Sequence, residues 1–316
     1  MSHLNCKLLV GITYRIYLVN SGHLRTGVSL LLAARFAEGE RATTGVQQAR
    51  IYAEMLGLNF AYATNGHTII EIDYLTGQET EIDQFPKPEE IWQRLTAANT
   101  FTETTAKTWI EPFNLTSGKT PRYYQHIAIN RVVESILSGK HRVLITMATG
   151  TGKTFVAFQI CWKLWKSRWN RSGEFRRPKI LYLADRNILV DDPMAKMLAP
   201  FEDVRHKISS SDVSQGRDMY FSIYQSLSSP ATDVFKEYPA DFFDIIIIDE
   251  CHRGSSREDN SWRAILTYFS PAVQLGMTAT PLRDESRDTY NYFGNPIYTY
   301  SLRRHRGWFS RPLPCP

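Results

Sequence analysis

The feature that most constrains the fold of this chain is a glycine-containing loop, residues 148–154, between an apolar segment and a helical one. The loop sequence is Ala-Thr-Gly-Thr-Gly-Lys-Thr, and it directly follows the apolar run Val143–Met147. Glycines let backbone N–H groups turn inward on an anion, and the start of the next helix adds the positive end of its dipole. The order strand, loop, helix is therefore typical of a phosphate-binding loop in an α/β protein.

Each loop residue has an expected role. Gly150 and Gly152 would shape the loop, Lys153 would reach the β- and γ-phosphates of ATP, and the Thr154 hydroxyl would bind Mg²⁺. Met147 replaces the first glycine of the general pattern, at a position that mainly sets loop entry. The alternative is a glycine turn that merely ends a strand. The loop residues expected to bind ATP are Thr149, Gly150, Thr151, Gly152, Lys153 and Thr154.

Around this loop the sequence alternates helical and strand patterns. We expect helices over 122–138 and 153–166, and strands over 143–147, 180–184 and 243–248. The unbroken isoleucines of 245–248 suit a strand buried on both faces. This alternation predicts an α/β fold with a doubly wound parallel sheet.

An acidic pair follows the strand predicted at 243–248, where the sequence is Asp249-Glu250-Cys251-His252. The carboxyl ends of parallel strands share one edge of the sheet, so the pair should face the phosphate loop. We expect Asp249 to hold Mg²⁺, Glu250 to orient and deprotonate the attacking water, and His252 to relay the nucleotide state. Taken alone, a solvated strand end would be the better interpretation. The phosphate loop reverses that preference.

Two weaker motifs complete the set. The segment Thr278-Ala279-Thr280-Pro281 ends another apolar strand, and hydroxyls of Thr278 and Thr280 could hydrogen-bond His252 and couple hydrolysis to domain movement. The segment beginning Arg122-Tyr123-Tyr124-Gln125 opens the helix before the first strand, where Arg122 and the Gln125 amide could contact adenine. Either motif alone is weak, and the order and spacing of all four favour function.

Composition sets only broad limits. A chain of 316 residues that is 43% apolar and 22% charged is typical of a globular protein. The net charge of +5 permits a nucleic-acid partner without demonstrating one. The four cysteines lack metal-ligand spacing, and apolar runs fall far short of the ~20 residues of a membrane helix. We therefore expect reduced thiols, no membrane contact and a cytoplasmic location.

Pattern also divides the chain. Residues 45–93 predict one helix and a hairpin of two strands that turns at Asn65-Gly66, and 94–120 form a polar connector after a short helix around 89–95. The predicted domains are an atypical segment 1–44, the end of a nuclease-like domain 45–93, a linker 94–120, an ATP-binding domain 121–302 and an aberrant tail 303–316.

The four motifs together resemble the first RecA-like domain of superfamily-two helicases, with the Asp-Glu-Cys-His spelling on the DEAH-like side. The resemblance implies ATP hydrolysis that drives movement along nucleic acid, with DNA contacts from residues 181–193 and 219–227. By position, Arg186 and Gln225 are carried over as possible DNA contacts. An equally good interpretation makes them ordinary surface-loop residues.

Longer strings, among them PRYYQHIAINRVVESI, MATGTGKT and DECHRG, resemble the R subunit of type I restriction enzymes over residues 45–302. The resemblance implies a multidomain ATP-dependent type I site-specific deoxyribonuclease and translocase that acts on double-stranded DNA with modification and specificity subunits. Two alternatives stay open. One is a non-catalytic remnant that binds ATP or partner subunits, and the other is a stand-alone DEAD/H-type helicase.

The chain departs from this family at both ends. The family's cutting domain contains an Asp, a Glu-x-Lys and a Gln-x-x-x-Tyr; Gln48 and Tyr52 match the last, but Ala33-Ala34-Arg35 stands where Glu-x-Lys is expected and no acid precedes Glu38. We expect no nuclease activity, with Gln48 and Tyr52 packing as a helix face. The family's second RecA-like domain would follow Pro316, so we expect weak nucleotide binding and negligible DNA-stimulated ATPase. We hypothesise that both ends are out of frame or fused.

Overall fold

The computed structural model describes most of two compact units, one formed by residues 1–113 and the other by residues 114–316. The described residues are 13–15, 31–35, 42–56, 58–98, 102–116, 118–185, 187–192, 198–208, 213–228, 233–249, 258–279 and 286–301.

The first unit is a five-stranded mixed sheet with the order β1-β2-β3-β4-β5. Strand β2 pairs with β3 in parallel, and the other neighbours pair antiparallel. Helix α1 covers this sheet through a core that includes Ala49, Ala53, Ala61 and Ile72. The elements are β1 (Thr13–Arg15), β2 (Leu31–Arg35), α1 (Ala42–Leu56), β3 (Phe60–Thr64), β4 (Ile69–Asp73), β5 (Gln78–Ile82), α2 (Pro88–Ala98) and α3 (Glu103–Ile110).

The predicted hairpin of the first unit is confirmed. The Asn65 side chain accepts hydrogen bonds from the N–H groups of His67 and Thr68, and Gly66 has a φ of 97°. The structure also contains a strand and a helix that the sequence did not indicate. Strand β2 lies within the segment interpreted as atypical, and helix α3 lies within the stretch interpreted as a connector.

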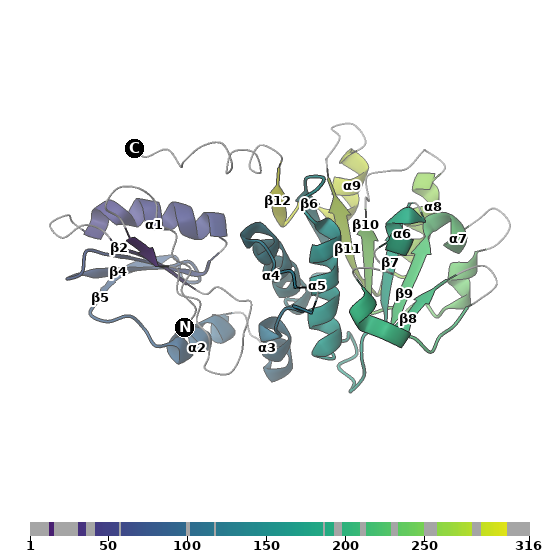
Figure 1. Ribbon diagram of the computed structural model, residues 1–316, viewed down its shortest axis with the longest axis horizontal. Coiled ribbons are helices and arrows are strands. Elements are labelled where there is room, and N and C mark those ends of the chain that lie inside the picture. The colour runs from purple at the N-terminus through teal and green to yellow at the C-terminus, as the bar shows by residue number, and fades with distance from the viewer. Residues whose placement is uncertain are drawn as a thin grey trace. The chain divides into compact units, whose positions relative to one another are not determined.

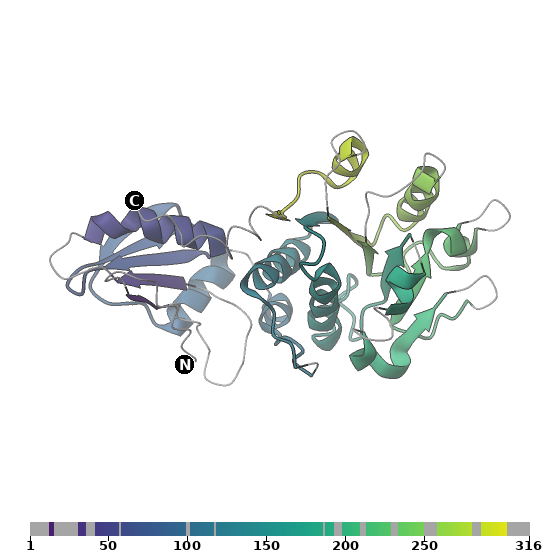
Figure 2. The ribbon, with the colours of Figure 1, turned by 45° about the horizontal axis from the view of Figure 1, so that its top comes forward.

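The second unit is built on a seven-stranded, fully parallel sheet with the order β12-β6-β11-β10-β7-β9-β8. Figures 1 and 2 show helices α4 and α5 on one face and α8 and α9 on the other. The strands are β6 (Arg142–Met147), β7 (Ile180–Ala184), β8 (Arg205–Lys207), β9 (Met219–Ile223), β10 (Ile245–Asp249), β11 (Val273–Thr278) and β12 (Tyr298–Tyr300). The helices are α4 (Tyr123–Leu137), α5 (Lys153–Lys166), α6 (Ile188–Asp192), α7 (Tyr224–Leu227), α8 (Glu258–Tyr268) and α9 (Ser286–Phe293).

The parallel sheet follows from its central strands. All of the residues in β7, β10 and β11 are buried, as expected for strands with helices on both faces. One face of the sheet packs under α8 and α9 through Leu144, Leu183, Ile248, Trp262 and Phe293. The predicted doubly wound α/β fold is confirmed.

Candidate functional site

The phosphate loop lies where the sequence places it, between the end of β6 and the start of α5. Gly150 and Gly152 have φ angles of 77° and 85°, in the left-handed region that favours glycine. Thr149 and Gly150 are exposed, whereas Thr151 and Lys153 are buried. The tip of the loop, at Thr149 and Gly150, is therefore open to solvent, whereas Thr151 and Lys153 are packed inside the protein.

The loop is anchored by one internal hydrogen bond and by contacts with the neighbouring strands. The Thr151 hydroxyl donates to the Ala148 carbonyl at 2.6 Å, so this side chain shapes the loop. The Ala148 N–H donates to the carbonyl of Tyr300 in β12 at 3.0 Å. The Lys153 ammonium lies 3.4 Å from the Met147 carbonyl, folded back along the loop. Lys153 would have to leave this long contact to reach a phosphate.

Gln125 contacts the phosphate loop directly. Its amide nitrogen donates to the Thr151 carbonyl at 2.8 Å, and its amide oxygen accepts from the Arg122 N–H at 2.9 Å. The side chain is buried, at 7% exposure. In the structure this amide links the start of α4 to the loop, and its predicted contact with adenine stays a prediction.

The contact between Gln125 and the loop leaves no room for a side chain at Gly152. A β-carbon there would lie 2.5 Å from the Gln125 amide nitrogen, at a φ of 85°. We expect Gly152→Ala to displace Gln125, distort the loop and lower ATP affinity at least about tenfold, because backbone strain of ~1–3 kcal/mol adds to the clash. Isothermal titration with ATP measures the change. Gly150→Ala is the matched control, because a β-carbon at Gly150 meets nothing within 4 Å although its φ is also positive. Equal losses in both variants would show that the Gln125 contact is unimportant.

Asp249 ends β10 at the same edge of the sheet, and its carboxylate is held by a tyrosine. The Tyr182 hydroxyl donates to Asp249 Oδ2 at 2.6 Å, and both side chains are buried. Burial and the adjacent Asp249 carboxylate raise the pKa of Tyr182 well above its ordinary value, so the hydroxyl keeps its proton. The same hydroxyl also interacts with Thr154. Tyr182 thus connects the two residues predicted to hold Mg²⁺.

The sequence interpretation missed Tyr182, whose hydroxyl orients Asp249. A buried tyrosine needs a partner for its hydroxyl, and a tyrosine inside the apolar strand of 180–184 was the available signal. We expect Tyr182→Phe to lower affinity for Mg²⁺-ATP severalfold, because Asp249 loses the donor that orients it. Tyr62→Phe is the control, because it removes a comparable bond of 2.7 Å to Glu71 in the first unit. Equal nucleotide affinity in all three proteins, measured by titration with and without Mg²⁺, would remove Tyr182 from the site.

Of the remaining predicted residues, some are located by the structure and the others lie outside its described part. Thr278 ends β11 and is buried, one strand from Asp249, in a register that pairs Asp249 with Met277. Gln225 is exposed on α7, directly after β9. Both therefore lie at the edge that carries the phosphate loop. Glu250, His252, Thr280 and Arg186 lie outside the described residues.

The first unit contains its own buried carboxylates. Glu71 and Asp73 on β4 are both bound by Arg94, at distances of 2.7 to 2.9 Å. The bond with Arg94 lowers the pKa of Asp73 although burial acts the other way. These acids follow Gln48 in the sequence, and the Arg94 guanidinium is shared between them. Gln48 and Tyr52 lie on α1, and their side chains are outside the described part of the chain. Within the described residues, no group of three or more possible metal ligands occurs.

The fold and the loop of the second unit together identify the class of protein domain to which it belongs. A glycine loop between a buried strand and a helix, with a buried aspartate at the end of a nearby parallel strand, is the arrangement of nucleoside-triphosphate-binding α/β domains. A family described as the type III restriction enzyme, res subunit, matches residues 118–283. The chain belongs to this family.

Its relatives include endonuclease subunits of type I restriction enzymes. The chain is 40% identical over 288 residues to the type I restriction enzyme EcoAI endonuclease subunit of Escherichia coli, which covers 88% of this chain and 35% of the relative. It is 30% identical over 210 residues to the EcoKI endonuclease subunit of E. coli strain K12, which covers 58% of this chain and 17% of the relative.

The chain is also similar to a solved structure in both sequence and fold. That structure is a fragment assigned to an HsdR subunit of a type I restriction enzyme from Vibrio vulnificus YJ016, with 52% identity and a TM-score of 0.75, covering 88% of this chain and 48% of that one. The second unit alone could not supply these 88% matches, so the first unit shares the similarity. The chain is a homologue of type I endonuclease subunits and spans about half or less of each relative. Among its described helices, none has the length and apolar character to cross a membrane.

Proposed function

We propose that the second unit binds ATP with Mg²⁺ and hydrolyses it to drive movement along double-stranded DNA, as the motor portion of a type I restriction endonuclease subunit. The observation that carries the proposal is the hydrogen bond from Tyr182 to Asp249 at the sheet edge that carries the phosphate loop. It fixes the carboxylate expected at the metal beside the loop expected to hold the phosphates.

The donor set suits Mg²⁺. A threonine hydroxyl and an aspartate carboxylate are hard oxygen ligands, which Mg²⁺ prefers in nucleotide sites. The bound ion would neutralise charge on the β- and γ-phosphates. Lys153 would contact the same phosphates, and the loop N–H groups would hold their oxygens. Glu250 would orient and deprotonate the attacking water, while His252, Thr278 and Thr280 would pass the nucleotide state onward.

DNA and protein partners follow from the relatives. Gln225, and Arg186 by its sequence position, would contact the DNA from the edge that carries the nucleotide. Modification and specificity subunits are the expected partners, and the cytoplasm is the expected compartment. We propose no cutting role for β2, because Ala33, Ala34 and Arg35 bring no carboxylate to its pairing with β3.

Hydrolysis and metal dependence test the proposal together. The full chain should bind ATP more tightly with Mg²⁺ than with EDTA, and Asp249→Asn should remove most of that difference while binding without metal persists. Phosphate release stimulated by duplex DNA would assign the motor role to this chain by itself and would overturn the negligible stimulation that the sequence predicts. Binding that ignores both Mg²⁺ and Asp249→Asn would instead favour a non-catalytic remnant.

A further inference from the structure

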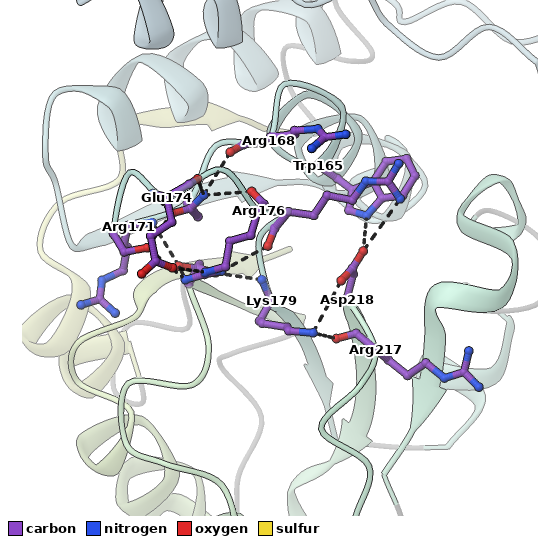
Figure 3. Close-up of polar contacts among 12 residues, drawn as sticks. Trp165, Arg168, Arg171, Glu174, Arg176, Lys179, Arg217 and Asp218 are labelled. Carbon is purple, nitrogen blue, oxygen red and sulfur yellow. Dashed lines mark hydrogen bonds and ion pairs between the residues drawn. The ribbon is translucent and has the colours of Figure 1, made fainter.

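A cluster of cations lies on the edge of the parallel sheet opposite to the phosphate loop. Residues 166–179 contain six basic residues and one acid, Glu174. They connect α5 to the amino end of β7, whereas the phosphate loop and Asp249 lie at the carboxyl ends of strands. We name residues 168–177 the basic platform, and Figure 3 shows it in close-up.

The basic platform is held in place by a buried carboxylate. Asp244 is 1% exposed and accepts hydrogen bonds from the N–H groups of Arg171 and Lys179, at 3.0 and 2.8 Å. The Arg176 guanidinium adds two more, at 2.6 and 3.0 Å. Arg176 is therefore committed to the structure of the platform.

A buried asparagine fixes the rest of the loop. The Asn170 amide nitrogen donates to the carbonyls of Arg168, Glu174 and Arg176, at 3.2, 2.7 and 2.9 Å. Its amide oxygen accepts from the Ser172 hydroxyl and the Glu174 N–H. The exposed side chains of the platform thus extend from a loop whose backbone these hydrogen bonds hold in place.

Arg168 occupies a position at which glycine is the usual residue. Helix α5 ends with hydrogen bonds from Trp169 N–H to the Leu164 carbonyl and from Arg168 N–H to the Trp165 carbonyl, which place Arg168 in a left-handed cap. Its φ is 62°, the only positive value at a non-glycine residue in the described chain. An arginine at a position that favours glycine indicates a use for its side chain.

The platform also displays an aromatic ring. Phe175 is 88% exposed, and the Arg168 guanidinium lies over it at 4.4 Å. Arg171 and Arg177 are also exposed, and the Arg177 guanidinium lies over the Trp165 ring at 3.8 Å. Figure 3 shows the guanidinium groups of Arg168 and Arg171 directed away from the hydrogen bonds that hold the loop. Cations and one exposed ring therefore share a rigid surface.

We propose that the basic platform binds a strand of nucleic acid with unpaired bases, with Arg168 and Arg171 contacting phosphates and Phe175 stacking on a base. Exposed guanidinium groups suit an anionic partner, and a polyphosphate backbone supplies repeated anions. A regular duplex would leave Phe175 without a partner, whereas an aromatic ring beside arginines is the chemistry of single-strand sites. The site lies away from the nucleotide edge, so it does not depend on ATP binding.

Fluorescence anisotropy of the full chain with a labelled oligothymidylate, without nucleotide and over a series of NaCl concentrations, tests the platform. The double variant Arg168→Gly, Arg171→Gln should lower the affinity for the oligothymidylate about tenfold near 100 mM salt. It should also make the slope of log K against log[NaCl] shallower by about 1.4, because each lost phosphate contact contributes ~0.7. Phe175→Ser should lower the affinity for the oligothymidylate about fivefold or more. The control Lys87→Gln, Lys107→Gln removes two charges from exposed residues of the first unit and should change neither quantity.

A stability readout separates binding from folding. Arg168→Gly alone relieves the left-handed backbone, so its thermal midpoint should stay equal or rise while its affinity for the oligothymidylate falls. The proposal is overturned if the double variant and Phe175→Ser bind the oligothymidylate with wild-type affinity and salt dependence. The proposal is also contradicted if these variants lose binding to polyglutamate but keep wild-type binding to the oligothymidylate. That result would assign the platform to an acidic protein partner.

Discussion

Lys153→Ala is expected to lower the affinity of the chain for ATP by about 10- to 100-fold, because a charge-assisted contact to phosphate contributes roughly 1.5–3 kcal/mol. Lys153 is the first residue of α5, buried at 8% exposure and close to the Met147 carbonyl. The loop itself is held by Thr151 and Gln125, so the variant should keep its fold. Titration with a fluorescent ATP analogue measures the loss.

Lys166→Ala is the matched control for this prediction. Lys166 is an exposed lysine in the last turn of the same helix, so it tests the loss of charge and of lysine packing without the loop. Its ATP affinity should equal that of the wild-type chain. If Lys153→Ala and Lys166→Ala bind ATP equally well, the phosphate loop is inert.

Asp244→Ala is expected to have the largest effect on stability, about 3–5 kcal/mol, because it removes a buried carboxylate that accepts two charge-assisted hydrogen bonds from the Arg176 guanidinium. It also removes the acceptor of two backbone N–H groups, those of Arg171 and Lys179. For a unit of this size the thermal midpoint should fall by roughly 10 °C. Differential scanning calorimetry of the full chain measures it.

The control for Asp244→Ala is an exposed ion pair. Asp233 and Lys236 lie 2.8 Å apart on the surface, where a single ion pair adds little. Asp233→Ala should leave the thermal midpoint where it is. A loss from Asp244→Ala that is no greater than the loss from Asp233→Ala would show that the Asp244 network does not stabilise the unit.

Strong local patterns were enough to predict the centre of the second unit. The bounds of α5 and β7 were predicted to the residue, because both segments carry continuous apolar patterns with clear ends. The edge strands were missed for physical reasons. Strand β5 has the polar sequence Gln-Glu-Thr-Glu-Ile and is mostly exposed, and β8 and β12 are only three residues long. Such strands depend on their neighbours for pairing.

The site shows the same division. Residues of the phosphate loop and Asp249 were predictable, because each is defined by its immediate sequence neighbours. The bond from Gln125 to Thr151 joins residues 26 positions apart, and the bond from Tyr182 to Asp249 joins residues 67 apart. Only the folded sheet brings these pairs together. The whole-chain charge of +5 likewise concealed the cations gathered in residues 166–179.

The most direct test of the ATP-binding site is a crystal structure of the chain with Mg²⁺ and a non-hydrolysable ATP analogue. We predict phosphate oxygens on the N–H groups of residues 150–154, Lys153 moved from the Met147 carbonyl to the β- and γ-phosphates, and Mg²⁺ near Thr154 and Asp249. A nucleotide bound elsewhere, with the phosphate loop empty and Lys153 unmoved, would contradict the account.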